Sequence, residues 1–237
     1  MRKTIAGALS ALLMLGVAST AQATSLQVAP VLVDVPTPGA ASKLTLRNRG
    51  SEQIKAQIRI FKWIQRNGKD ELVPTRDVVA SPPLVKISPN GSNLVRIVRV
   101  SKAPLKGEEA YRLIVDQLPD RSKKSGIAVK LQMRYSIPVF FGASNGEEPK
   151  LAWTVKANGS TLSVTNTGRR HVRVSELSMK SAKGVKIGGK NGLVGYVLSN
   201  SMANFNIKLS KKAKKGSQIL ITANAQHGQI KVKSRVQ

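Results

Sequence analysis

The sequence offers few side chains that could carry out catalysis or bind a metal. It contains no Cys, which excludes disulfide scaffolds, thiolate zinc sites, iron–sulfur clusters and cysteine nucleophiles. Its two His, His171 and His227, lack partners at metal-ligand spacing. The sequence has no nucleophile elbow, phosphate loop or zinc-binding helix motif. We therefore expect a protein that is not an enzyme and has no metal or other cofactor.

Positive charge is the most abundant chemical feature of the chain. The 237 residues include 39 Lys and Arg but only 12 Asp and Glu, which gives a formal net charge of +27 at pH 7. Such a balance suggests nucleic acid, an anionic surface or an acidic partner. The cluster at 169–173 could bind phosphate or could be a solvated strand edge. The cluster at 211–215 could contact a membrane or could be a solvated loop.

The first 23 residues predict a cleaved secretory signal. Arg2 and Lys3 give a positive start, residues 5–17 are apolar, and residues 21–23 have the Ala-Gln-Ala pattern of a cleavage site. The apolar run is shorter than the roughly 20 residues that a spanning helix needs, although an uncleaved anchor helix is the alternative. We therefore expect a protein that acts outside the cytoplasm and for which nucleic acid is not the partner.

The rest of the chain alternates apolar and polar residues with a period of two, which predicts half-buried strands. No convincing amphipathic helix follows residue 24. Asn-Gly pairs suit tight hairpins, and they occur at 67–68, 90–91, 145–146, 158–159 and 191–192. Strand-like runs occur at 26–34, 43–47, 53–61, 93–100 and 109–115, and the longest covers 127–141.

A polar stretch at 143–149 divides the chain into two parts of different charge. Residues 24–149 hold 20 basic and 11 acidic residues, whereas residues 150–237 hold 17 basic residues and one acidic residue. We predict an N-terminal immunoglobulin-like domain at 24–143, a linker at 144–149 and a C-terminal β-sandwich at 150–237. Trp63 and Trp153 are expected to anchor a core or the contact between the domains.

Several segments, taken in order, carry a family resemblance. Residues 81–91 read Ser-Pro-Pro-Leu-Val-Lys-Ile-Ser-Pro-Asn-Gly, and Val-Arg follows at 95–96. Residues 109–119 end in Leu-Pro, and residues 128–141 form a long strand-like run whose first half alternates apolar and polar residues. Over about 25–149 the chain resembles the PapD-like periplasmic pilus assembly chaperones, whereas over 150–237 only the length and the β pattern agree. The resemblance implies an all-β fold of two immunoglobulin-like β-sandwich domains joined at an angle, in a boomerang shape.

The resemblance implies binding rather than a reaction. Such chaperones hold pilin subunits that lack their last strand, lend them the chaperone's own G strand, and pass them to an outer-membrane usher. An ordinary core strand is the alternative for this run, and the free protein could also cap the strand by forming a dimer. The expected subunit-binding side chains alternate along the G strand and are Val129, Leu131, Met133 and Tyr135.

The sequence departs from the family at the usual clamp for the subunit's C-terminal carboxylate. By ungapped pairing the clamping Arg and Lys fall on Pro30 and Pro138, which carry no charge. The chain therefore resembles the divergent branch called archaic or alternative. Arg112 is our first candidate for a replacement anchor and Arg134 the second, because a guanidinium can bind a carboxylate bidentately. Each Arg could instead face solvent.

Two further residues resemble a structural ion pair of the family. Arg96 and Glu109 correspond to a pair near the domain junction, where they would orient the two domains. Two other functions compete with the chaperone hypothesis. The positive charge would suit an exported protein that binds anionic polymers or surfaces, and a pilin or adhesin subunit is the third alternative. The two-domain organisation argues against the third.

Overall fold

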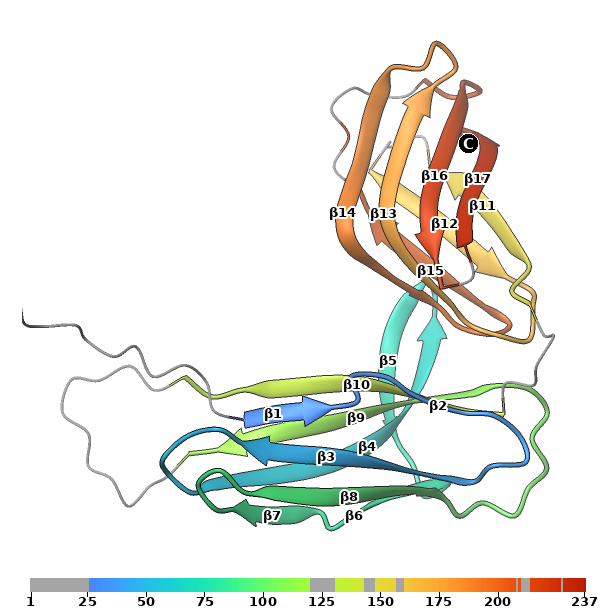
Figure 1. Ribbon diagram of the computed structural model, residues 1–237. Helices are drawn as coiled ribbons and strands as arrows, with labels where there is room; N and C mark the ends of the chain where they lie inside the picture. The colour runs from blue at the N-terminus through green and yellow to red at the C-terminus, as the bar shows by residue number, and fades with distance from the viewer. Residues whose placement is uncertain are drawn as a thin grey trace, which may run out of the picture.

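The computed structural model describes residues 26–119, 131–142, 148–156, 160–207, 209, 214–226 and 228–237 (Figure 1). These residues form seventeen strands and no helix, so none of them forms a helix that could cross a membrane. The strands build two β-sandwiches whose long directions meet at an angle (Figure 1). The prediction of an all-β fold with two joined sandwiches is confirmed. The expected signal at 1–23 lies outside the described residues.

The first sandwich consists of two sheets. One sheet has the order β1 (Leu26–Ala29), β3 (Ala41–Asn48), β8 (Ser92–Arg99) and β6 (Val78–Ser81). The other has the order β2 (Val33–Val35), β10 (Arg134–Phe141), β9 (Glu109–Leu118), β4 (Ile54–Arg66) and β5 (Lys69–Pro74), with β7 (Leu84–Ile87) also paired to β4. The run expected at 26–34 is divided at Pro30, which has no N–H to donate to a ladder. Its two halves, β1 and β2, therefore pair in different sheets.

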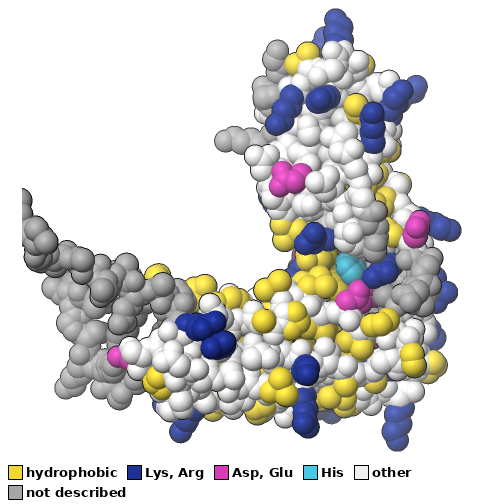
Figure 2. Space-filling view, viewed as in Figure 1, with side chains coloured by type: hydrophobic (Ala, Val, Ile, Leu, Met, Phe, Trp, Pro, Cys, Tyr) yellow, Lys and Arg dark blue, Asp and Glu magenta, His cyan; other side chains and the backbone are white. Residues whose placement is uncertain are grey.

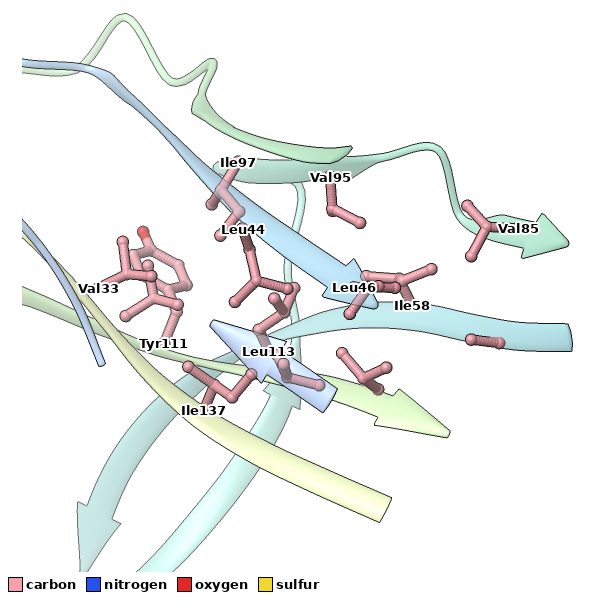
Figure 3. Close-up of a cluster of buried hydrophobic side chains, with 14 of the residues drawn as sticks. Val33, Leu44, Leu46, Ile58, Val85, Val95, Ile97, Tyr111, Leu113 and Ile137 are labelled. Carbon is pink, nitrogen blue, oxygen red and sulfur yellow. The ribbon is translucent and has the colours of Figure 1, made fainter. Parts of the chain in front are cut away.

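The period-two alternation places one face of each strand in a common core. Figure 3 shows side chains of β3, β8, β9 and β10 that point into the space between the two sheets. Burying a leucine side chain completely contributes about 1.5–3 kcal/mol, so this cluster is the main stabilising element of the first sandwich. Its fully buried members include Leu44, Leu46, Val95, Ile97, Tyr111 and Leu113.

The second sandwich has a three-stranded and a four-stranded sheet. The smaller contains β11 (Leu151–Val155), β12 (Thr161–Asn166) and β15 (Ser201–Asn206). The larger has the order β14 (Lys186–Val197), β13 (Val172–Ser181), β16 (Gln218–Ala225) and β17 (Gly228–Arg235). Trp153 lies in the core between them, as expected. The hairpin expected at 191–192 is wrong, because both residues lie inside β14, where Gly192 donates its N–H to Glu176 Oε1 at 2.7 Å.

The β4–β5 hairpin extends from the first sandwich to the second (Figure 1). Its tip is the predicted Asn67-Gly68 turn, and both residues have positive φ, 53° and 76°. Asn204 of β15 donates its backbone N–H to the Gly68 carbonyl at 2.8 Å. A Cβ on Gly68 would lie 2.1 Å from Asn204 Nδ2, so this close approach requires glycine.

An apolar cluster joins the two sandwiches. It contains Trp63 of β4, Ala110 of β9 and Phe140 of β10, packed against two residues of the second sandwich, Tyr196 and Leu198. The Trp63 and Tyr196 rings meet edge to face at 5.4 Å between centroids. Trp63 therefore anchors the contact between the domains, which was one of the two roles expected for it.

Hydrogen bonds complete the contact between the sandwiches. Gln65 donates to the Tyr196 carbonyl at 2.8 Å and accepts from the Leu198 N–H at 2.9 Å. Glu108, whose side chain is buried, accepts the backbone N–H of His171 at 2.8 Å and contacts His171 Nδ1 at the same distance. Since these polar groups satisfy one another away from water, they favour one orientation of the sandwiches.

The expected ion pair of Arg96 with Glu109 is wrong. Glu109 instead pairs with Arg99, whose Nε lies 2.9 Å from Glu109 Oε2 and whose side chain is only 9% exposed. The alternation along β8 explains the difference, because Val95 and Ile97 face the core while Arg96 faces outward. Arg99 also donates to the carbonyls of residues 101 and 103, so the pair fixes a loop of the first sandwich rather than the domain contact.

This geometry predicts effects of different size for two arginines of β8. Arg99→Ala should lower the free energy of unfolding by about 3 kcal/mol, because it leaves Glu109 without its partner. Arg96→Ala should change it by less than about 0.5 kcal/mol. Urea unfolding of both variants and the unaltered protein measures the difference. Equal effects of the two substitutions would contradict the assignment.

The Arg99 effect should also depend on pH. Burial raises the pKa of Glu109, but hydrogen bonds from Arg99 and Tyr111 outweigh burial and hold that pKa below its usual range. The stabilisation is therefore present above the unfolded-state pKa of about 4.3 and is lost as the pH falls through the lower folded-state pKa. The stability difference between the unaltered protein and Arg99→Ala should shrink over that range, and a constant difference would contradict the linkage.

Candidate functional site

Strand β10 is paired along one side but only partly along the other. On one side β9 pairs with the whole of β10, whereas on the other side β2 pairs only with Val139, Phe140 and Phe141. Residues 134–138 therefore present an open edge in the described structure. Gln117 donates its N–H to the Met133 carbonyl at 2.9 Å, which fixes the alternation of the ladder. Arg134 and Ser136 consequently point their N–H and C=O groups away from β9.

The strand expected at 127–141 begins later than predicted. Its described part starts at Arg134, and residues 131–133 are described but lie outside the strand. The ladder with β9 is paired from Arg134, opposite Asp116, onward, and Met133 adds one further hydrogen bond by accepting the N–H of Gln117. Residues 127–130 of the expected run lie outside the described residues.

The four expected subunit-binding side chains do not share one environment. Leu131 is 70% exposed, and Met133 is partly buried but lies outside the core cluster. Tyr135 packs against the core of the first sandwich and donates its hydroxyl to the Leu26 carbonyl at 2.5 Å. The core-strand alternative is therefore correct for Tyr135. Val129 lies outside the described residues.

Exposed apolar side chains lie beside the open edge. Val31 is 73% exposed, and Leu32 is also exposed. Both precede Val33, whose pairing with Val139 brings this segment alongside β10. Figure 2 shows hydrophobic side chains along this edge of the first sandwich and into the angle between the sandwiches. An open strand edge with an adjoining apolar surface is a place where another chain can add a strand.

Arg112 lies on the face of β9 that looks into the angle between the two sandwiches. Its guanidinium carbon is 3.7 Å from the centroid of the Trp63 ring and 5.4 Å from that of Tyr196. Burial lowers the pKa of Arg112, partly offset by the charges of Tyr196 and Asp70. Within the described part of the chain Arg112 makes no salt bridge, and its polar contact is with the Ser136 carbonyl at 3.5 Å. Among the described residues the site therefore holds a half-buried cation that no carboxylate pairs with.

The two prolines at the family's clamp positions have different places in the structure. Pro138 is buried directly opposite Arg112 in the β9–β10 ladder. Arg112 of β9 thus supplies a positive charge directly beside Pro138, the position of β10 that carries no charge. Pro30 is exposed between β1 and β2.

The second candidate anchor, Arg134, is already paired. It is exposed and forms an ion pair with Asp116, which also binds Arg59 at 2.6 Å. Burial raises the pKa of Asp116, but hydrogen bonds from Arg134 and Arg59 outweigh burial and lower that pKa. Of the two candidates, Arg112 is therefore the one with its charge available.

The basic cluster at 169–173 belongs to the domain contact. Arg170 pairs with Asp34 of the first sandwich at 3.0 Å, Arg169 donates to the Lys106 carbonyl, and His171 binds Glu108. These contacts leave neither a phosphate site nor a free strand edge there. The second cluster, at 211–215, lies mostly outside the described residues. No group of His, Asp and Glu in the described ranges is placed to hold a metal ion.

Proteins with a similar fold and sequence include pilus chaperones. The chain is 28% identical over 110 residues to chaperone proteins FaeE and ClpE of Escherichia coli, which covers 44% of this chain and 42% and 41% of theirs. The match thus spans less than half the length of these relatives.

Solved structures agree over nearly the whole chain. A chain of the CsuC–CsuE chaperone–tip adhesion subunit pre-assembly complex, from the archaic chaperone–usher Csu pili of Acinetobacter baumannii, matches with 28% identity and a TM-score of 0.69. That match covers 90% of this chain and 100% of the other. A chain of the Salmonella enterica SafA pilin–SafB chaperone complex shares the fold, with 16% identity, a TM-score of 0.61 and coverage of 91% and 98%.

A family model gives the assignment. Residues 25–145 match the model described as "Pili and flagellar-assembly chaperone, PapD N-terminal domain". The matched range contains β1 to β10, and therefore both the open edge and Arg112. The chain belongs to the PapD-like family of pilus assembly chaperones.

Proposed function

We propose that this protein is a periplasmic chaperone that holds pilin subunits by strand donation and delivers them to an outer-membrane usher. The observation that carries the proposal is the open edge of β10 at residues 134–138, beside the exposed side chains of Leu131 and Val31. An immunoglobulin-like subunit that lacks a strand has unpaired backbone groups and an uncovered apolar groove. Strand addition satisfies both needs at once.

The contributions to binding can be ordered by size. Each main-chain hydrogen bond added at Arg134 or Ser136 contributes about 0.5–1.5 kcal/mol net. Complete burial of an exposed leucine such as Leu131 contributes about 1.5–3 kcal/mol. The apolar side chains are therefore expected to supply most of the affinity, and the backbone groups to set the register.

Arg112 is proposed as the anchor for the subunit's C-terminal carboxylate. The Trp63 ring holds the guanidinium at the angle between the sandwiches, where a chain end lying along β10 can reach it. A charge-assisted hydrogen bond is stronger in a partly buried site than in water. The open edge of β10 can also accept the strand edge of a second copy of this chain. A capping dimer of the free protein is therefore a further prediction.

The alternative of an exported protein that only binds anionic polymers is not favoured. The chain belongs to a chaperone family, and polymer binding would not require the open edge of β10. The family is one of chaperones rather than enzymes, in keeping with the lack of catalytic motifs in the sequence.

The apolar side chains beside β10 give the first test. The double variant Leu131→Glu and Met133→Glu should no longer form a soluble complex with a co-expressed cognate pilin subunit, because charge replaces the apolar surface. The matched control is Leu84→Glu with Leu94→Glu, which alters two exposed leucines elsewhere on the first sandwich. Retained capture by the first variant, or equal loss in the control, would move the binding site away from β10.

Arg112 gives the second test. Arg112→Ala should weaken binding of a subunit with a free C-terminal carboxylate by about tenfold to a hundredfold, the range for a hydrogen bond to a charged group. Arg112→Lys should restore part of the loss, and circular dichroism checks that both variants fold. The loss should disappear for a subunit whose C-terminus is amidated. An equal loss with the amidated subunit would show that Arg112 acts by packing on Trp63 rather than as the anchor.

A further inference from the structure

The outer face of the four-stranded sheet of the second sandwich carries a row of cations. One row of paired residues crosses all four strands. Lys180 of β13 is paired with Lys186 of β14 on one side and with Leu220 of β16 on the other. Leu220 is in turn paired with Lys233 of β17. Lys231 and Arg235 flank Lys233 on the same face of β17. We name this set the distal basic face; its members are exposed and are Lys180, Lys186, Lys231, Lys233 and Arg235.

These charges do not stabilise the sandwich. No member of the distal basic face forms a salt bridge within the described part of the chain. Glu176 is the one acidic residue in the sequence from 150 to 237, and its carboxylate accepts the N–H of Gly192. Like charges directly opposite each other, as at Lys180 and Lys186, destabilise a sheet. The arrangement therefore calls for an explanation other than stability.

The distal basic face lies far from the angle between the sandwiches. Arg173 pairs with Tyr196 at the end of β13 near the first sandwich, and Lys180 lies seven residues further along β13. At the rise of a strand this corresponds to roughly 20 Å. Figure 2 shows Lys and Arg side chains over the end of the second sandwich that points away from the first. A partner at this face would leave Arg112 and the edge of β10 uncovered.

The residue types indicate the class of partner. The face contains four Lys and one Arg, its one central apolar residue is the partly buried Leu220, and no described residue facing outward from it is aromatic. Protein interfaces concentrate their energy in Trp, Tyr and Arg and are depleted in Lys. A membrane with anionic lipids instead attracts exposed cations individually, at about fivefold in affinity for each. We propose that the distal basic face binds the surface of an anionic phospholipid bilayer.

Vesicle sedimentation tests this proposal with the purified protein. The protein should sediment with vesicles of phosphatidylglycerol and phosphatidylcholine but not with phosphatidylcholine alone, and added salt should release it. The variant Lys180→Gln, Lys231→Gln, Lys233→Gln and Arg235→Gln should bind more weakly, by about fivefold for each cation removed. Its capture of a pilin subunit should be unchanged, which reports folding and tests the proposed function separately.

A matched control removes the same charge from the first sandwich. Its substitutions are Lys43→Gln, Arg47→Gln, Lys86→Gln and Arg96→Gln, all at exposed positions. This control should keep most of the vesicle binding. The proposal is overturned if neither variant loses vesicle binding, if both lose it equally, or if the unaltered protein does not bind the anionic vesicles. It is also overturned if the four distal substitutions abolish subunit capture and leave vesicle binding intact, because the face would then serve an acidic protein.

Discussion

The rest of the structure depends on strand β10, which is paired with β9 along its whole length but with β2 only at its last three residues. The inner face of β10 lies in the core of the first sandwich through Ile137, Val139 and Phe141, and Phe140 on its outer face packs into the domain contact. These contacts fix β10 on both faces from Ile137 to Phe141, and Tyr135 also packs against the core. Since β2 reaches only its last residues, the edge at 134–138 is open and already ordered. A preordered edge lowers the entropy cost of adding a strand.

The contact between the sandwiches and the proposed anchor share one side chain. Trp63 packs against Phe140 and Tyr196 in the domain contact, and its ring also lies under the guanidinium of Arg112. The Asn67-Gly68 turn and the Glu108–His171 hydrogen bonds restrict the angle from either side of this cluster. The position of the cation is therefore set by the same contacts that set the angle between the domains.

The sequence predicts the local features of this structure well and the long-range pairings poorly. Period-two alternation is visible along each strand, so the all-β fold, the Asn67-Gly68 hairpin and the core faces could be predicted. The ion-pair partner of Glu109 depends on which arginine of β8 lies on the inward side of the strand. That arginine is Arg99, at the end of β8, and not Arg96. The stacking of Arg112 on Trp63 joins strands far apart in the sequence. A mid-strand Arg could signal a site, but no local pattern indicates the ring beneath it.

The central claim is that β10 donates its open edge, and amide hydrogen exchange tests it most directly. Exchange of the segment 131–138 is compared by mass spectrometry in the free protein and in its complex with a pilin subunit that lacks its last strand. The account predicts slower exchange on binding, concentrated at the Arg134 and Ser136 amides, which point away from β9. Unchanged exchange at both amides in a complex that has demonstrably formed would contradict it.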